Sequence, residues 1–419
     1  MRISRRSALA ISVFVLLGIV VALGSWYERR RSMPGQSTDS TVVNVTNGGA
    51  RGPGTLREAL FIVAAAAGKA TIAVKVPNIS VESALPPLVN PHGVSIVAQP
   101  VGTQIDAHAL SAGPVFDVAG PNTSIEGLHI INCPGAAILL RAVRFRLQST
   151  AIDSCDVGVD VAENASDTLL EQNRFTGNRL AVRFAAAGHN TNVDKNEFSG
   201  DKDAGLWAVR SDADSRGDPI NVHDNKFRDD RAGIVAGNIP ILVERNDMFN
   251  SHEAAIHIVG AGAVIHGNRI SGGASMGIVT ENARGAIIDN NELDGFTAYG
   301  IMVRGSANTL VRNNRLHNCG YGLAFVLGDA GNPSTAVENT IIEPKFNGID
   351  VVGDSPILRR NSVVRPHALA LHVEEFQPLG GQKVPAKPFL DNNNFGTNAL
   401  TASKGPVAAA GDSKQRAPQ

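Results

Sequence analysis

Residues 286–303 read AIIDNNELDGFTAYGIMV, and residues 309–326 read TLVRNNRLHNCGYGLAFV. Both contain an apolar stretch, polar residues that end in Asn, one apolar residue, a turn, and then Gly followed by alternating apolar positions. The phrase recurs from residue 122 onward, and its Asn residues are Asn173, Asn196, Asn225, Asn246, Asn268, Asn291 and Asn314, then Asn361, with an irregularity near Asn339. The intervals between the first seven are 23, 29, 21, 22, 23 and 23 residues, which indicates a repeat protein.

A second column of small residues keeps the same spacing, at Gly158, Ala181, Gly205, Gly233, Ala255, Gly277, Gly300, Gly322, Gly348 and Ala370. A repeat of this length holds three short strands joined by turns, with alternating side chains, as at Ile301 and Val303 (inward) and Met302 (outward). One repeat cannot bury its own apolar face, so successive repeats stack with parallel strands about 4.8 Å apart. These features predict an all-β, single-stranded solenoid of about 12 coils over residues 42–398.

The recurring Asn has a structural explanation. An amide side chain both donates and accepts hydrogen bonds, so Asn residues that lie above one another can connect successive coils. We therefore assign the Asn column to the stability of the solenoid rather than to its function.

The three cysteines follow the same register. Cys133, Cys155 and Cys319 each come three residues after an inward apolar residue of their coil. Stacking of adjacent coils brings the Cα atoms of Cys133 and Cys155 to about 5 Å, within the range of a disulfide. Either a reduced buried pair or a disulfide fits this spacing, and the parallel alignment of the two side chains favours the reduced pair.

The repeats resemble those of right-handed parallel β-helix proteins, the pectate-lyase-like superfold, across residues 42–398. Residues 52–60, GPGTLREAL, resemble the segment that opens secreted pectate lyases, and an apolar strand follows at residues 71–74. Thr55 as N-cap, with Glu58 three residues later, predicts a helix over residues 55–67, which Gly68 ends. We expect this helix to cap the solenoid, because an open edge of paired strands promotes aggregation.

The two ends of the chain differ from the repeats. Residues 8–27 are apolar apart from Ser12 and Ser25, and they are long enough to cross a bilayer. Residues 1–31 are therefore predicted to be an export signal or a membrane anchor, residues 32–41 a linker, and residues 399–419 a disordered tail poor in large apolar residues. We expect a periplasmic or extracellular protein, either anchored or secreted. The 38 basic and 39 acidic residues give no electrostatic reason for a nucleic-acid partner.

Acidic turns of three consecutive coils form the main candidate site. They carry Asp201 and Asp203, then Asp229, Asp230 and Arg231, then His252 and Glu253. Stacking in register brings these groups close together, and crowded carboxylates raise one another's pKa. A general acid and an ionised partner can then coexist, as glycoside chemistry requires. Alternatively, these residues only make the turns soluble.

The acidic turns resemble those of polygalacturonases, which are also β-helices. The resemblance implies that Asp229 and Asp230 are the paired catalytic carboxylates, Asp203 the single preceding carboxylate and His252 the assisting histidine, and we add Glu253 to the catalytic candidates. The chain lacks the Asn-Thr-Asp-Gly, Gly-His-Gly and Arg-Ile-Lys motifs of that family. The assignment therefore rests on the spacing of the acidic turns.

A second candidate is a row of outward ionisable residues beside the Asn column: Glu171, Asp194, His223, Glu244, His266, Asp289 and Arg312. With Arg231, the members from His223 onward are candidates for substrate binding, and the alternative is that the row keeps one face of the solenoid soluble. Asp212, Asp214 and Asp218 lie in the longest insertion and could offer oxygen ligands to Ca²⁺, but Arg216 occupies a ligand position. We therefore expect no metal or other cofactor.

Three functional hypotheses follow from the fold and the acidic turns. The first is an exported envelope protein that binds or modifies a polysaccharide, as a lyase, hydrolase or epimerase. The second is a non-catalytic carbohydrate-binding or surface scaffold protein. The third is a periplasmic accessory factor that resembles β-helix proteins of copper-site assembly.

Overall fold

The structure is a computed structural model that describes residues 40–211, 217–260, 262–273, 275–379, 381–396, 401–403 and 408–410. The chain divides into two compact units, Met1–Ser40 and Thr41–Gln419, and the second contains every described strand. The predicted membrane segment, residues 8–27, and residues 212–216 of the proposed calcium loop lie outside the described residues. Within those ranges, no helix combines the length and the apolar character needed to span a bilayer.

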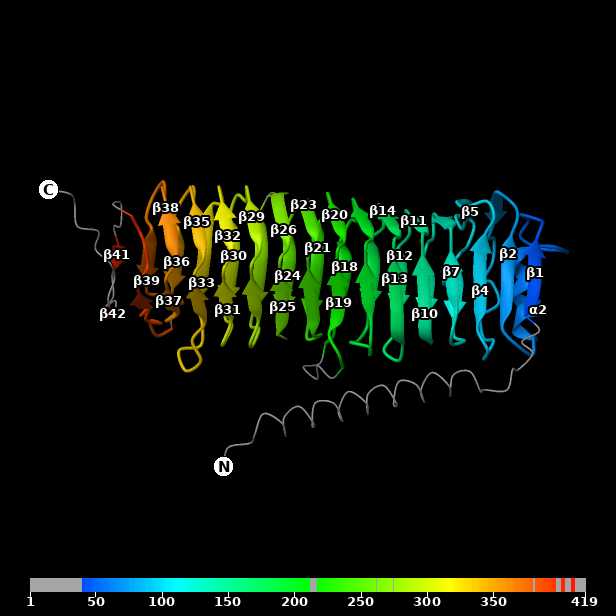
Figure 1. The fold of residues 1–419 in the computed structure, drawn as a ribbon, viewed down its shortest axis with the longest axis horizontal. Helices are drawn as coiled ribbons and strands as arrows, with labels where there is room; N and C mark the ends of the chain where they lie inside the picture. The colour runs from blue at the N-terminus through cyan, green and yellow to red at the C-terminus, as the bar shows by residue number, and fades with distance from the viewer. Residues whose placement is uncertain are drawn as a thin grey trace, which may run out of the picture. The chain divides into compact units, whose positions relative to one another are not determined.

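Three parallel sheets build the second unit, and a complete coil contributes one strand to each sheet (Figure 1). Sheet A has 16 strands, from β1 (Thr41–Val45) to β42 (Ala408–Ala410), and sheet B has 13, from β3 (Asn78–Ser80) to β38 (Ser362–Val364). Sheet C also has 13, from β6 (Phe116–Val118) to β41 (Thr401–Ser403). The right-handed parallel β-solenoid is confirmed, with about 13 turns rather than about 12.

Consecutive strands of sheets C and A carry the candidate site residues. In sheet C they are β9 (Ala136–Leu140), β12 (Val157–Val161), β15 (Leu180–Phe184), β18 (Ala204–Val209), β21 (Ala232–Gly237), β24 (Ala254–Val259), β27 (Met276–Glu281), β30 (Tyr299–Arg304), β33 (Tyr321–Val326), β36 (Ile349–Val352) and β39 (Leu371–Glu374). In sheet A they are β13 (Ser166–Glu171), β16 (Asn192–Asp194), β19 (Ile220–His223), β22 (Ile241–Glu244), β25 (Ala263–His266), β28 (Ile287–Asp289) and β31 (Leu310–Arg312).

The core lies inside the coils, where inward side chains stack on their equivalents one turn away. Ile301 and Val303 are buried and Met302 between them is half-buried, as the alternation predicts. In sheet B, Phe175, Phe198 and Phe227 form a stack with ring centroids 5.1 and 4.5 Å apart. Such columns bury apolar surface continuously along the solenoid, which no single repeat could do.

The predicted Asn column is a continuous hydrogen-bonded ladder. The backbone N–H and the Nδ2 of Asn173 both donate to Oδ1 of Asn196, at 2.9 and 3.0 Å, and the same pair of bonds repeats in the following coils. Within the described residues, the ladder includes Asn339 and reaches Asn393. The apparent irregularity near Asn339 is therefore a longer turn, because the strands keep their register while the turn absorbs the extra residues.

Cys133 and Cys155 lie in adjacent coils, with their Cα atoms 4.3 Å apart, and they form a disulfide. The predicted stacking is confirmed, whereas the preference for a reduced pair is corrected, since the close approach of the two coils brings the sulfur atoms into bonding contact. Cys319 is buried and unpaired.

A helix precedes the repeats, as predicted, but it is shorter. It is α2 (Leu56–Ala64), and Thr55 is its N-cap, accepting a hydrogen bond from the backbone N–H of Glu58. Leu56, Leu60 and Val63 are buried in the solenoid core. The role of this helix as an end cap stays a prediction.

The C-terminal segment was expected to be disordered from residue 399. Two short strands within it, β41 and β42, pair in parallel with β39 and with β40 (Phe389–Asp391). The backbones of these two strands add one further layer to sheets C and A, and the disorder of the segment stays a prediction.

Candidate functional site

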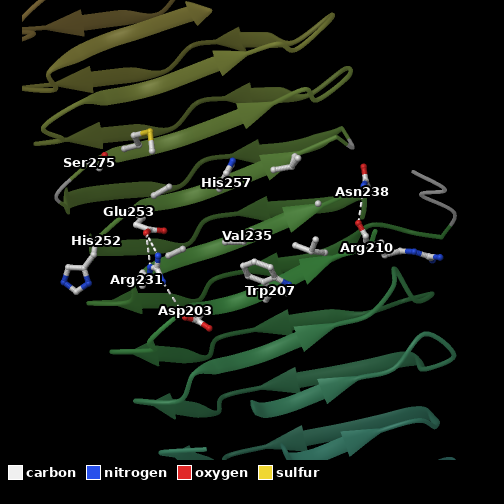
Figure 2. Close-up of a pocket in the computed structure, with 16 residues that line it drawn as sticks. Asp203, Trp207, Arg210, Arg231, Val235, Asn238, His252, Glu253, His257 and Ser275 are labelled. Carbon is white, nitrogen blue, oxygen red and sulfur yellow. Dashed lines mark hydrogen bonds and ion pairs between the residues drawn. The ribbon is translucent and has the colours of Figure 1, made fainter. Parts of the chain in front are cut away.

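A groove of about 940 Å³ lies on the outer face of sheet C (Figure 2). Its base consists of Trp207, Val235 and His257, which occupy the same outward position in β18, β21 and β24 and are neighbours in register. These side chains point outward because the flanking residues of each strand, such as Leu206 and Ala208, point into the core. The groove thus extends across successive coils.

Trp207 is the largest side chain of this base. It packs on a small apolar cluster outside the main core, formed by Val157, Leu180, Ala204 and Ala232. The indole is only half-buried, so one part of it is held by the protein while another remains accessible to a ligand. Sequence analysis missed Trp207, although a Trp at an outward strand position is a usable signal, because solvation would favour a polar residue there.

A chain of ion pairs runs along one edge of the groove, in the turns that precede the sheet C strands. Arg179 pairs with Asp156 at 2.6 Å and with Asp203 at 3.0 Å. Arg231 lies 3.7 Å from Asp203 and 2.6 Å from Glu253. Positive and negative groups therefore alternate from coil to coil, and the hydrogen bond from Arg179 lowers the pKa of Asp156. Figure 2 shows Arg231 between the two carboxylates.

Four of the predicted residues line this groove: Asp203, Arg231, His252 and Glu253. Arg210, Asn238 and His257 also line it and were not anticipated from the sequence. At the end of the groove away from the charged edge, Asn238 Nδ2 donates to the backbone carbonyl of Arg210 at 3.2 Å. This contact joins the ends of two neighbouring strands, β18 and β21, and orients the Asn238 side chain.

Asp229 and Asp230 do not form the predicted catalytic pair. Asp230 is fully buried, and its Oδ1 accepts a hydrogen bond from the backbone N–H of Asp201 at 2.9 Å. Asp229 is exposed at a left-handed turn position (φ 58°), where its Oδ1 accepts from Asn250 Nδ2 at 2.6 Å, outside the groove lining. The assignment is therefore corrected, because consecutive residues of this turn face opposite sides of the coil.

Asp201 and Asp230 instead belong to a second, shorter ladder. The backbone N–H of Cys155 donates to Asn178 Oδ1, and that of Asn178 donates to Asp201 Oδ1. Burial raises the pKa of both aspartates, and the charge of Asp230 raises that of Asp201 further. The crowded carboxylates expected from the sequence do exist, but they lie inside the solenoid, where a polysaccharide cannot reach them.

The outward row beside the Asn ladder is confirmed as a row in register. Its members pair from strand to strand in sheet A in the predicted order: Glu171, Asp194, His223, Glu244, His266, Asp289 and Arg312. Arg312 and His266 both contact Asp289, at 3.1 and 3.4 Å. None of the seven lines the groove on sheet C, so the two candidate sites do not converge.

Solved structures with this architecture share little sequence with the chain. They include the catalytic domain of a GH87 α-1,3-glucanase in complex with tetrasaccharides (TM-score 0.50, 16% identity, 81% of this chain and 67% of that chain). They also include DFA-IIIase from Arthrobacter chlorophenolicus A6 in complex with GF2 (TM-score 0.54, 11% identity, 73% and 95%). A third is the catalytic unit of a thermostable GH87 α-1,3-glucanase from Streptomyces thermodiastaticus strain HF3-3 (TM-score 0.51, 14% identity, 91% and 70%).

At these identities the likenesses show the fold alone, and no curated protein sequence matches the chain. The family is shown by the sequence itself. Residues 75–217 and 213–364 match the family described as "Right handed beta helix region", in agreement with the three-sheet solenoid and its ladders. The chain therefore belongs to the right-handed β-helix family.

Proposed function

We propose that the groove on sheet C binds a polysaccharide. The observation that carries the proposal is the half-buried Trp207 at the base of a groove whose edge is formed by Asp203, Arg231 and Glu253. A sugar ring has an apolar face that packs on an aromatic ring, and hydroxyl groups that bond to carboxylates and guanidinium groups. An apolar base with a few polar groups at its edge is the usual composition of such a ligand site.

The outer face of sheet C continues beyond the groove in a way that suits a chain rather than a single sugar. Met276 of the groove is followed in register by Tyr299 and Tyr321, whose rings stack with centroids 5.0 Å apart. The exposed ring of Phe346 lies tilted against Tyr321, with ring centroids 5.2 Å apart. Coils rise by about 4.8 Å, similar to the length of one sugar unit. A linear polysaccharide could thus contact successive coils.

Binding without hydrolysis is the version that the groove geometry favours. A glycoside hydrolase needs one carboxylic acid that keeps its proton beside a second, ionised carboxylate. Asp203 and Glu253, two carboxylates that line the groove, are both paired with Arg231. The structural likeness to enzymes that act on carbohydrates supports a carbohydrate ligand, and the ion pairs with Arg231 suit the two groove carboxylates to binding that ligand. Export through residues 1–31 remains part of the proposal.

Replacement of Trp207 should weaken polysaccharide binding without unfolding the protein, because its side chain lies outside the main core. We expect Trp207→Ala to weaken polysaccharide binding by at least about tenfold, since a central Trp typically contributes about 2 kcal/mol or more to an interface. Trp207→Phe should retain part of the affinity, because it keeps an aromatic face. Isothermal titration calorimetry with an α-1,3-glucan, a fructan and an acidic polysaccharide measures the effect.

Leu139→Ala is the matched control for Trp207→Ala. Leu139 occupies the same outward column in β9, three coils from Trp207 and on the side away from Tyr299, and it does not line the groove, so its replacement should leave affinity unchanged. An equal effect of both substitutions, or no effect of Trp207→Ala on a polysaccharide that the protein binds, would contradict the proposal.

The same mixtures of protein and polysaccharide test whether the protein cleaves its ligand. We expect the bound polysaccharide to keep its chain length, as measured by size-exclusion chromatography after prolonged incubation, because both groove carboxylates are charge-paired. Release of shorter products that Glu253→Gln abolishes and Leu139→Ala does not would instead establish an enzyme. That outcome would overturn the non-hydrolytic version while keeping the groove as the binding site.

A further inference from the structure

A second group of polar side chains lies on sheet A, away from the groove on sheet C. Asp194 ends β16, His223 ends the next strand of the sheet, β19, and Asp224 follows His223 in the turn. His223 Nδ1 lies 3.1 Å from Asp194 Oδ1 and 3.1 Å from Asp224 Oδ2. One atom from each of the three residues falls within 4.8 Å of the others.

Hydrogen bonding alone leaves this group incompletely satisfied. A ring nitrogen carries at most one hydrogen, so His223 Nδ1 cannot donate to both carboxylates at once. Its hydrogen bond is with Asp224 Oδ2. Asp194 is 7% exposed, and its Oδ1 is buried and has no hydrogen-bond partner among the described residues, although it faces the same nitrogen. A buried carboxylate oxygen that lies beside an imidazole nitrogen but accepts no hydrogen bond is costly, which indicates that a further group completes the site.

We propose that Asp194, His223 and Asp224 bind a divalent transition-metal ion of the Zn²⁺ class. One imidazole nitrogen and two carboxylate oxygens are ligands that such ions prefer, with metal–ligand distances near 2.1 Å. Tetrahedral ligands at that distance lie about 3.4 Å apart, close to the two separations of 3.1 Å. A deprotonated Nδ1 and both carboxylates would then face the same cation, and water would fill the remaining position.

The neighbouring charges set the conditions for binding. Lys195 Nζ contacts Asp194 Oδ2 at 2.6 Å, and Arg245 contacts both oxygens of Asp224 at 3.0 Å. The bond from Arg245 to Oδ2 of Asp224 competes with the ion, whereas the bond from Arg245 to Oδ1 of Asp224 can persist. Both cationic side chains are about half exposed (54% and 53%), so they can turn toward solvent. Glu171 and Glu244 flank the site in register and add negative charge.

The ion would connect two coils across a long interval of the Asn ladder. Asn196 and Asn225, which follow the site in the two coils, are 29 residues apart. The ligands are distant in an unfolded chain, so binding energy stabilises the folded coils. The inferred role is a clasp between the coils on either side of the inserted turn, independent of the proposed polysaccharide groove.

Calorimetric titration of the full chain with Zn²⁺, without a histidine tag, tests the inference. We expect one ion per chain and a rise in the unfolding temperature with added Zn²⁺. His223→Gln and Asp194→Asn should each weaken binding by at least about tenfold, since even outer-shell changes cost that much. Both variants keep similar volume, and circular dichroism without metal verifies that each is folded.

His266→Gln is the matched control. His266 lies two coils further along the same row and approaches Asp289 at 3.4 Å, but Gly267 follows it where Asp224 follows His223. Its replacement should leave Zn²⁺ affinity unchanged. The inference fails if the wild-type chain binds no Zn²⁺, if His266→Gln weakens binding as much as His223→Gln does, or if Ca²⁺ binds there more tightly than Zn²⁺.

Discussion

Asn246→Ala is expected to lower the free energy of unfolding by about 4 kcal/mol, since each buried polar group left without a partner costs about 1–3 kcal/mol. Asn246 is 1% exposed. Its Oδ1 accepts from the backbone N–H and the Nδ2 of Asn225, both at 3.0 Å. Its Nδ2 donates to Asn268 Oδ1 and to the carbonyl of Val222. Removal of the amide therefore interrupts the ladder in the middle of the solenoid, where water has no access to replace it.

The control for the ladder is Asn221→Ala. Asn221 is an outward residue of β19, and its Nδ2 makes one partly buried bond to Asn192. Its loss should change stability by about 1 kcal/mol or less. Denaturant titration followed by circular dichroism compares the midpoints, because a repeat array need not unfold in two states. Equal effects of the two substitutions would show that the ladder contributes nothing beyond an ordinary surface amide.

The double substitution Asp201→Asn/Asp230→Asn is expected to stabilise the protein at alkaline pH. Burial raises the pKa of Asp201 to about 8 and that of Asp230 to about 7. Oδ2 of each carboxyl is buried and has no hydrogen-bond partner among the described residues. An amide at both positions extends the arrangement of Asn178, whose Nδ2 donates to the carbonyl of Ile152 at 3.1 Å. The variant therefore keeps the ladder without a buried charge.

The sign of the pH dependence follows from proton binding. Between the unfolded Asp pKa of about 3.9 and the raised folded values, the folded state holds more protons than the unfolded state, so stability falls as pH rises. As pH rises across this window, one such carboxyl lowers the free energy of unfolding by on the order of 4 kcal/mol, at 1.36 kcal/mol per pKa unit. Unfolding temperatures at pH 5 and pH 9 should differ strongly in the wild type and little in the double variant.

Asp247→Asn provides the comparison for this pH experiment. Asp247 is about half exposed and lies 3.7 Å from Arg228, so its charge is solvated. The variant should keep the wild-type dependence of the unfolding temperature on pH. If the double variant also kept that dependence, the buried aspartates would not be its origin.

Much of the fold could be predicted because each coil of a solenoid repeats the same short sequence of strands and turns. The spacing from Asn173 to Asn314 and the alternation at Ile301–Val303 were sufficient for the sheets and their register. The ladder residue Asn339 was misjudged because the preceding turn makes its interval 25 residues. The disulfide between Cys133 and Cys155 could not be settled, since spacing specifies proximity but not bonding.

The candidate sites depended on finer geometry. Asp229 and Asp230 are consecutive, and only the path of the turn sends one outward and the other into the core. Trp207 could be identified as a site residue only from the structure, which places it in the same groove as Arg231 and Glu253. Asp224 could likewise be identified only from its position beside Asp194.

The sequence by itself therefore determined the solenoid, the register of its columns and the residues that stack within each column. These properties follow from strand alternation and from hydrogen bonding between identical coils, which depend on residue spacing alone. Only the tertiary structure decided which turn residues face outward and which columns form a groove. Those outcomes depend on the backbone angles of individual turns and on contacts between columns, and neither is encoded in a periodic pattern.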